Sequence, residues 1–349
     1  MSKIEEGNAY IRQAEKSLKT SLLKWRPDFE VAADEYTNAA TCFKIARSYQ
    51  QCRDCLMKAS DCYKENRAWF HAAKSIEQAM LICKEMGKLA DIPKLAHKSC
   101  SLYQTHGSPE SGATVLDKAG KIVEASNPQE ALELFKRAAN IVMGEDSPRQ
   151  AAEYMSKVAR LSVKLQMYDE AADAIRREMG MHQQIDHAPS VGRLTVALVL
   201  VQLARGDQVA AEKDYREWGN YCEAPEAETL ETLLQAYDNG DVDVAKVALN
   251  NSFIKHMDVE YAKLARVIPL PQQQEFAVKP EEVEANATES YTSSNAETLM
   301  DQTARETQGM DKELHTDTAK DIIEKEEEQG TSSQNVQKED DDEYEGGLC

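Results

Sequence analysis

The 349-residue chain contains no run that approaches the roughly 18 consecutive apolar residues of a membrane-spanning helix. Residues 1–6 also lack the apolar segment of a secretory signal. The alternation of apolar and polar residues that marks half-buried strands is absent as well. From these absences we expect an all-α, cytoplasmic protein that does not span a membrane.

The short motifs of nucleotide-binding loops, dinucleotide-binding turns, zinc proteases and serine hydrolases are all missing. The seven histidines are scattered, and the closest pair, His182 and His187, has a spacing that does not share one helix face. Cys52 and Cys55 have the spacing of a metal-binding pair, but no second pair accompanies them to complete four ligands. We therefore predict no enzymatic activity, no metal and no cofactor.

The eight cysteines of a chain without a secretory signal are expected to be free thiols. Cysteine behaves as a small hydrophobic residue when it is buried. Cys42, Cys62, Cys83 and Cys100 are therefore predicted to pack between helices rather than to take part in chemistry.

Acidic charge is concentrated in the C-terminal part of the chain. Of the 61 Asp and Glu residues, 22 fall within residues 269–349, which hold only 6 of the 41 Lys and Arg residues. The rest of the chain is therefore nearly neutral, which disfavours nucleic-acid binding but leaves room for patches of both signs. The polar composition of residues 269–349 predicts a disordered acidic tail, because it cannot offset the entropy of ordering.

A short alanine-containing phrase recurs with a period near 40 residues. Ala32, Ala72, Ala113 and Ala151 occupy the same place in successive copies, with steps of 40, 41 and 38 residues. Such a period, with small residues where helices cross, is typical of a tetratricopeptide-like solenoid of helical hairpins. A solenoid presents an extended surface, which suits the binding of another protein.

The helical pattern changes character after residue 193. Residues 196–201 are apolar nearly all round, which predicts a central helix buried between neighbours. We predict about 12 to 14 helices in all, arranged as a repeat solenoid over residues 1–193 and a C-terminal helical bundle over residues 194–268. Gly87, Gly107 and Gly206 stand where helices are expected to end.

Apolar and basic residues interleave in the turn between the first two predicted helices. Leu22, Leu23, Lys24 and Trp25 could dip into a membrane interface, where nearby basic residues attract anionic lipid. Alternatively, Trp25 and Phe29 pack the first helix against the second. The sequence leaves both interpretations open.

A second candidate surface consists of basic residues on the predicted repeat helices. Lys157, Arg160 and Lys164 share one helix face, because they follow i, i+3, i+7 spacing. An acidic helical partner would fit such a face, although a merely solvated face has the same pattern. The complete set is Lys118, Lys121, Arg137, Lys157, Arg160 and Lys164.

A third candidate surface is acidic and lies in the predicted bundle and tail. It includes Asp238, Asp241 and the acidic run over residues 340–345, which precedes Leu348 near the chain end. This surface could dock on a basic partner. An acidic tail can also serve only to keep a protein soluble.

Several longer phrases resemble the family of soluble NSF attachment proteins (SNAP), and within it the gamma type. They are the Leu-Lys-Trp-x-Pro-Asp phrase within residues 18–28, residues 66–74, 119–121 and 261–264, and the final Gly-Gly-Leu-Cys. The resemblance implies a non-enzymatic adaptor that binds the four-helix SNARE complex at membranes and recruits and stimulates the hexameric NSF ATPase. It also implies peripheral association of a cytoplasmic protein with the membrane surface.

The resemblance also implies roles for particular residues. Leu22, Leu23 and Trp25 fall in the membrane loop, Lys157 on the SNARE-facing surface, and Asp238 and the penultimate Leu348 at the NSF-facing end. The chain departs from the alpha-type pattern at Glu153, where that type has a lysine, and at Thr114. An alternative function is a tetratricopeptide-like scaffold for other partners, such as a chaperone co-factor, but the basic clamp typical of such scaffolds is not found.

Overall fold

The computed structural model describes residues 2–20, 25–145 and 147–271. These residues all belong to one compact unit, Met1–Phe276. The acidic tail that the sequence predicts as disordered lies outside the described residues from residue 272 onwards.

The part of the chain that the structure describes is all helical, with no strand, which confirms the predicted fold class. The first ten helices are α1 Lys3–Leu18, α2 Phe29–Ile45, α3 Tyr49–Glu65, α4 Trp69–Glu85, α5 Ile92–His106, α6 Pro109–Val123, α7 Pro128–Met143, α8 Pro148–Lys164, α9 Tyr168–Gln184 and α10 Ala188–Arg205. They are followed by α11 Gln208–Trp218, α12 Ala224–Asn239, α13 Val242–Leu249, α14 Ser252–Lys255 and α15 Val259–Leu264, and two 3-10 turns are η1 Leu89–Asp91 and η2 Gly219–Tyr221. The fifteen α-helices exceed our predicted range of 12 to 14, and α14, with four residues, is too short to show a periodicity in the sequence.

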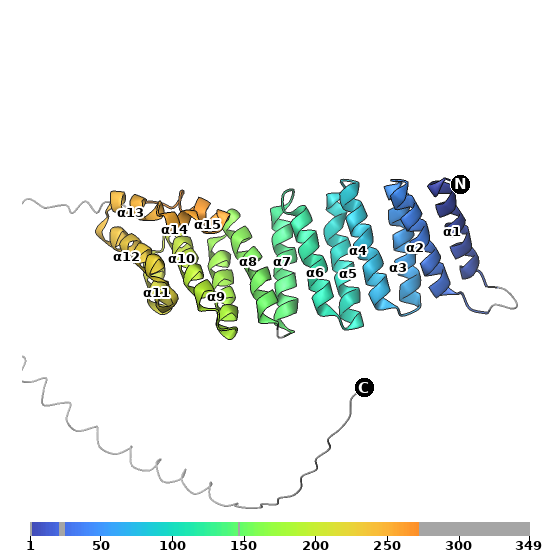
Figure 1. The fold of residues 1–349 in the computed structure, drawn as a ribbon, viewed down its shortest axis with the longest axis horizontal. Coiled ribbons are helices and arrows are strands. Elements are labelled where there is room, and N and C mark those ends of the chain that lie inside the picture. Colours follow the sequence, from blue (N-terminus) through green and yellow to red (C-terminus); the bar gives the residue numbers. More distant parts are fainter. Residues whose placement is uncertain (1, 21–24, 146, 272–349) are drawn as a thin grey trace, which may run out of the picture. The chain divides into compact units, whose positions relative to one another are not determined.

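Helices α1 to α10 stand side by side in a row, and each packs against the helices that precede and follow it (Figure 1). Hydrogen bonds between side chains also join alternate helices. The Nη1 atom of Arg137 on α7 lies 2.8 Å from Nδ1 of His97 on α5, and the Nη2 atom of Arg176 on α9 lies 3.0 Å from Oδ2 of Asp214 on α11. Odd-numbered helices therefore form one layer and even-numbered helices the other. This arrangement confirms the predicted solenoid of helical hairpins.

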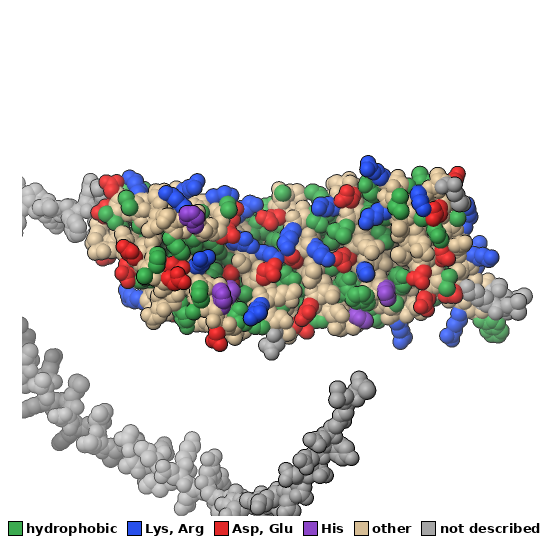
Figure 2. Space-filling view, in the orientation of Figure 1, with side chains coloured by type: hydrophobic (Ala, Val, Ile, Leu, Met, Phe, Trp, Pro, Cys, Tyr) green, Lys and Arg blue, Asp and Glu red, His purple; other side chains and the backbone are tan. Residues whose placement is uncertain are grey.

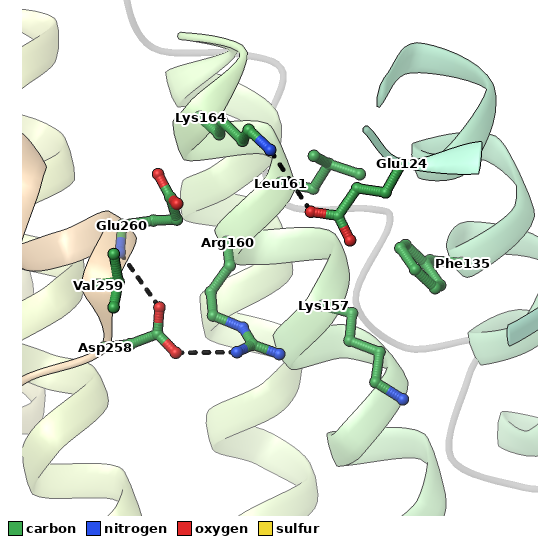
Figure 3. Close-up of a pocket in the computed structure, with 9 residues that line it drawn as sticks. All are labelled: Glu124, Phe135, Lys157, Arg160, Leu161, Lys164, Asp258, Val259 and Glu260. Atoms are coloured by element: carbon green, nitrogen blue, oxygen red, sulfur yellow. Dashed lines mark hydrogen bonds and ion pairs between the residues drawn. The ribbon is translucent and has the colours of Figure 1, made fainter. Parts of the chain in front are cut away.

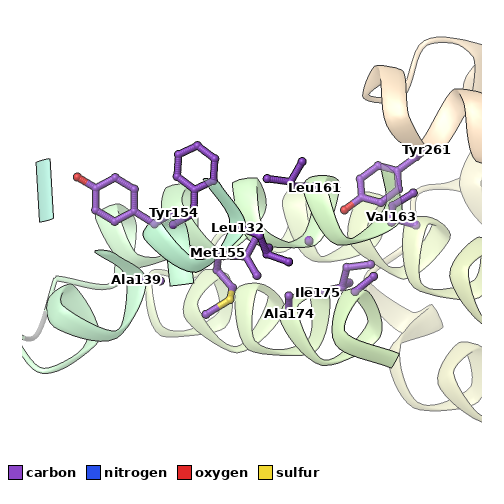
Figure 4. Close-up of a cluster of buried hydrophobic side chains, with 14 of the residues drawn as sticks. Leu132, Ala139, Tyr154, Met155, Leu161, Val163, Ala174, Ile175 and Tyr261 are labelled. Carbon is purple, nitrogen blue, oxygen red and sulfur yellow. The ribbon is translucent and has the colours of Figure 1, made fainter. Parts of the chain in front are cut away.

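Small residues lie where the helices cross. Ala32, Ala72, Ala113 and Ala151, which mark the sequence period, are all fully buried. Alanine allows two helix axes to approach closely, and larger side chains then fill the space on either side of the crossing. Figure 4 shows such a cluster, in which side chains of α7, α8 and α9 pack together with Tyr261 of α15.

The central part of helix α10 is buried on all sides, as the sequence predicted for residues 196–201. Every residue over 194–203 is buried, because α10 contacts α9, α11, α12, η2 and α15. The predicted boundary between solenoid and bundle, at residues 193 and 194, falls inside α10. The division into two domains therefore remains a prediction, since one helix belongs to both.

The helix ends follow from local sequence signals. Gly87, Gly107 and Gly206 adopt positive φ angles of 69°, 86° and 85° at the ends of α4, α5 and α10, a conformation that glycine adopts without strain. Asn127 caps α7 by accepting a hydrogen bond from the backbone N–H of Glu130. Ser147 stands at the equivalent place before α8 but makes no side-chain capping bond.

The chain returns to the solenoid after α13. Helix α15 packs against α8 and α10, as Figure 1 shows at the orange end of the row. The hydroxyl of Tyr237 on α12 donates a 2.6 Å hydrogen bond to the carbonyl of Pro269, so the segment after α15 is also anchored. None of the described helices is both long enough and apolar enough to cross a bilayer.

Two helical glycines make a direct test of this packing. A Cβ atom on Gly192 of α10 would lie 2.4 Å from the backbone carbonyl oxygen of Tyr221, whereas a Cβ atom on Gly180 of α9 would meet nothing within 4 Å. We predict that Gly192→Ala lowers the free energy of unfolding by about 1–3 kcal/mol, because the backbone must shift. Gly180→Ala should raise it by up to about 1 kcal/mol, because alanine favours helix. Urea denaturation measures both, and an unchanged midpoint for Gly192→Ala would contradict the close approach of η2 to α10.

Candidate partner-binding surface

The basic residues predicted on α6 form ion pairs within the protein. The Nζ atom of Lys118 lies 2.7 Å from a carboxylate oxygen of Glu77 on α4, the preceding helix of the same layer. The Nζ atom of Lys121 lies 2.7 Å from Asp117, one turn earlier on α6 itself. Both lysine side chains remain about half exposed, so their charges are balanced but still accessible.

Lys157 on α8 is held more tightly than the others. Its Nζ atom lies 2.7 Å from Asp117 and 2.9 Å from Glu153, and 4.9 Å from the centre of the Tyr154 ring. Only 11% of its side chain is exposed. Burial disfavours the charged ammonium group, but the hydrogen bonds to Asp117 and Glu153 outweigh it and raise the pKa of Lys157. Glu153, the departure from the alpha-type pattern, therefore neutralises Lys157 directly.

Arg160 and Lys164 line a groove of about 240 Å³ on α8, which is bounded by the end of α6, by α7 and by the start of α15 (Figure 3). The Nη1 atom of Arg160 forms an ion pair with Oδ2 of Asp258, just before α15, at 2.8 Å. The Nζ atom of Lys164 forms a longer ion pair, of 3.5 Å, with Oε1 of Glu124 at the end of α6. Lys157 also lines the groove, but its side chain extends away from Lys164 in Figure 3. The structure thus brings Lys157, Arg160 and Lys164 together, as their spacing predicted.

The partners in these ion pairs follow the sequence period. Lys118 pairs with Glu77, 41 residues earlier, and Lys164 pairs with Glu124, 40 residues earlier. A step of one repeat places two residues side by side on neighbouring helices of one layer. The acidic partners were missed in the sequence, although opposite charges separated by one repeat were the signal that could have found them. These partners are Glu77, Asp117 and Glu124, whereas Asp258 lies 98 residues from Arg160 in the sequence and gave no such signal.

The resulting surface has no single sign of charge. On the face shown in Figure 2, basic and acidic side chains are interspersed along the row of helices. Arg137, which the sequence grouped with these basic residues, lies on α7 in the other layer and bonds to His97 instead. The prediction that Arg137 belongs to the same basic surface as Lys118, Lys157 and Lys164 is therefore wrong.

Trp25 is the described part of the predicted membrane loop, and 88% of it is exposed. Leu22, Leu23 and Lys24 lie outside the described residues. Phe29, in contrast, packs against the buried cluster formed by α1, α2 and α3. The interpretation that Trp25 is buried as a helix staple is therefore wrong, and Phe29 alone has that role.

Two of the predicted NSF-facing residues, Asp238 and Asp241, lie at the end of the helical row that is opposite α1 (Figure 1). Asp238 is exposed in the last turn of α12, where a carboxylate is unfavourable beside the negative end of the helix dipole. Asp241 begins α13 and accepts hydrogen bonds from the backbone N–H groups of Asp243 and Val244, at 3.1 and 3.0 Å. Leu348 lies outside the described residues.

A second cavity, of about 200 Å³, lies between α8, α9, α10 and the segment that leads into α15. Glu178 is almost fully buried there, and burial raises the pKa of its carboxyl group despite the opposing effect of His182. The ring of His187 lies 5.6 Å from that of His182, because the turn before α10 brings the two together. No group of metal-ligating side chains occurs among the residues that the structure describes. Cys52 and Cys55 are buried in α3, and burial raises the pKa of each thiol to about 11.

A row of helical hairpins with an extended, charge-balanced face defines a helical-repeat protein. The chain belongs to the family of soluble NSF attachment proteins (SNAP), which its residues 5–253 match, and this confirms the family predicted from the sequence. The family is one of adaptors rather than enzymes.

Three curated proteins illustrate the similarity. The gamma-soluble NSF attachment protein of Dictyostelium discoideum is 26% identical over 264 residues, which cover 75% of this chain and 82% of that protein. The gamma-soluble NSF attachment protein of Arabidopsis thaliana is 24% identical over 260 residues, which cover 74% of this chain and 89% of that protein. The alpha-soluble NSF attachment protein of Vitis vinifera is 26% identical over 247 residues, which cover 68% of this chain and 84% of that protein.

The different burial of Lys157 and Lys164 predicts different effects on stability. Lys157→Ala should lower the free energy of unfolding by about 1–3 kcal/mol, because it removes one of the two partners of the buried Asp117 carboxylate. Lys164→Ala should change it by less than about 1 kcal/mol, because its pair with Glu124 is long and exposed. Thermal or urea unfolding measures both, and equal effects would show that burial does not distinguish the two ion pairs.

Proposed function

We propose that this chain is an adaptor that binds the SNARE complex at a membrane surface and recruits and stimulates the NSF ATPase. Family membership is the observation that carries the proposal, because it implies an NSF attachment role. The relatives that match most of the chain are themselves named as NSF attachment proteins. The accessible cations on α6 and α8 support the choice of an acidic helical partner.

The SNARE-facing residues in this proposal are Lys118, Lys121, Arg160 and Lys164, with Lys157 positioned behind them. The side chains of the three accessible lysines are 43–55% exposed. An exposed ion pair is worth only about 0–1 kcal/mol, so a lysine can exchange its own carboxylate for one on a partner at little cost. Because neighbouring acids cancel the field at long range, binding would depend on direct contacts.

The binding experiment uses purified chain, immobilised SNARE complex and added NSF. The double variant Lys118→Glu/Lys164→Glu should bind the SNARE complex about tenfold more weakly, which corresponds to about 1.4 kcal/mol, and should recruit less NSF. The matched control is Lys58→Glu/Lys98→Glu, which makes the same change of charge one repeat apart on α3 and α5 of the other layer. Equal weakening by both variants would argue against a specific face, and a wild-type chain that recruits no NSF would refute the proposed function.

The membrane part of the proposal involves Leu22, Leu23, Lys24 and Trp25. Burial of each exposed Leu or Trp side chain in a lipid interface is worth roughly 1.5–3 kcal/mol. Leu22→Ser/Leu23→Ser/Trp25→Ser should therefore reduce sedimentation with anionic liposomes. The thermal midpoint should stay nearly unchanged, since Trp25 is exposed.

Phe29→Ser is the control for that experiment. Phe29 packs against the α1–α3 cluster, so its removal should lower the thermal midpoint instead of specifically affecting liposome binding. A large loss of stability in the triple variant would identify the loop residues as part of the core.

The NSF-facing end in this proposal comprises Asp238, Asp241 and Leu348. The carboxylate of Asp238 works against the dipole of α12, and contact with a basic partner would explain its presence. Asp241 already caps α13, so its replacement would also affect the helix. Asp238→Lys should therefore reduce NSF recruitment while SNARE binding persists. Loss of both activities would show that the substitution does not act through a specific contact with NSF. Leu348→Ala should lower NSF stimulation without abolishing recruitment.

A further inference from the structure

The cavity of about 200 Å³ between α8, α9 and α10 has buried polar atoms without partners. Among the described residues, Oε2 of Glu178, Nδ1 of His182 and the hydroxyl of Tyr261 form no hydrogen bond. All three residues line the cavity. Glu178 is only 5% exposed and Tyr261 only 4% exposed. A buried polar group without a partner is destabilising, so three of them in one place are unlikely to serve stability alone.

The carboxyl group of Glu178 is the most deeply buried acid of this cavity. Its Oε1 atom lies 3.8 Å from Nε2 of His182, one turn later on α9, which is longer than an ordinary hydrogen bond. Burial raises the pKa of the carboxyl group above its ordinary value of 4.5, although His182, Ser156 and Arg160 act in the opposite direction. The docked structure therefore favours the neutral form of Glu178.

The other charged or titratable side chains that line the cavity come from α8, α9, α10 and the segment that leads into α15: Arg160, His182, Arg193, His256, Asp258 and Tyr261. Arg160 already pairs with Asp258 at 2.8 Å, and Nδ1 of His256 lies 2.6 Å from the carbonyl oxygen of Ser252. Arg193 is exposed and acts on the carboxyl group of Glu226. The ring of His187 lies 5.6 Å from that of His182, not on the carboxyl group. No cation is thus dedicated to Glu178.

The segment over residues 256–268, which we call the strap, forms one wall of the cavity. It contains α15, a helix of six residues, which is too short to be stable without tertiary contacts. Tyr261, Leu264 and Ile268 of the strap are buried, and α15 contacts α8 and α10. Tyr261 reaches from α15 into the buried cluster that includes Val163 of α8 (Figure 4). The strap is therefore held by packing over the site of Glu178.

We propose that Glu178 and the strap form a proton-dependent latch, in which the strap stays docked while Glu178 is protonated and is released when the carboxyl group ionises. A neutral carboxyl group costs far less to bury than a carboxylate without a paired cation. Release gives the carboxylate access to water, withdraws Tyr261 from the cavity and separates Asp258 from Arg160. The latch does not depend on the partners proposed above, because all of its groups belong to this chain.

The direction of the pH dependence follows from the two states of Glu178. In the released state the carboxyl group is in water and titrates near 4.5, whereas in the docked state burial raises its pKa. Docking is therefore most favourable below pH 4.5 and weakens as the pH rises towards the pKa of the docked state. Between these two values the equilibrium constant for release increases about tenfold per pH unit.

Hydrogen exchange of the purified full-length chain measures the release. After correction for intrinsic exchange rates, amides of the strap should lose at least about tenfold of their protection between about pH 5 and pH 8. Amides of α3, which lies far along the row, should keep theirs. Glu178→Gln preserves the size of the side chain but cannot ionise, so its strap should stay protected within about twofold over the same range.

Two further variants make the comparison specific. Glu133→Gln on α7, where the side chain is 69% exposed, is the matched control and should retain the pH dependence of the wild type. Tyr261→Phe removes a buried hydroxyl that has no partner, so protection of the strap at about pH 5 should be equal or higher. The histidines around the cavity remain in Glu178→Gln, so the difference between this variant and the wild type belongs to the carboxyl group.

The wild-type chain alone is sufficient to refute the latch, because strap amides with unchanged protection from about pH 5 to pH 8 would contradict it. An equal loss of protection in the wild type and in Glu178→Gln would also overturn it. Loss of protection in α3 together with the strap would show global unfolding instead of release. None of these results involves NSF or the SNARE complex, so the proposed function is tested separately.

Discussion

Each helix in this protein buries its apolar side only against its neighbours, and the alanines at the crossings make that burial possible. Ala72 and Ala113 illustrate the constraint, because their buried positions leave room for an adjacent helix but not for a larger side chain. The spacing of about 40 residues between such positions then determines which surface residues of successive repeats lie side by side. Two residues one repeat apart lie on adjacent helices of one layer, so the sequence period determines which charges meet.

The fold was predictable from the sequence because its signals are local and repeated. The alanine period, the glycines at helix ends and the all-round apolar pattern of α10 each correspond to observed features. The short helix α14 was harder to predict, because a segment of four residues has too few positions to show a periodicity. Helix α15 is held by tertiary contacts with α8 and α10, which the sequence does not reveal.

The candidate surface was predictable only in part, for a different physical reason. Helical spacing correctly grouped Lys157, Arg160 and Lys164 on one face, because it depends on a single helix. Whether a lysine is available to a partner depends on its neighbours in the next repeat, and spacing within one helix does not give that. Lys157 is consequently buried between acids, whereas Lys44 and Lys84, which no spacing within a helix singled out, line one cavity and form no ion pair among the described residues.

The return of the chain onto α8 and α10 has a mechanical consequence. Between α1 and α7, the strongest contacts of each helix are with its immediate neighbours, so small changes at every crossing can add up to bending of the row. At α8 and α10 the added helix α15 spans two members of one layer, and the ion pair between Arg160 and Asp258 anchors it. Because α15 contacts both α8 and α10, we expect the C-terminal half of the row to resist bending more than the N-terminal half. We therefore expect bending of the row to be concentrated at the crossings between α1 and α7.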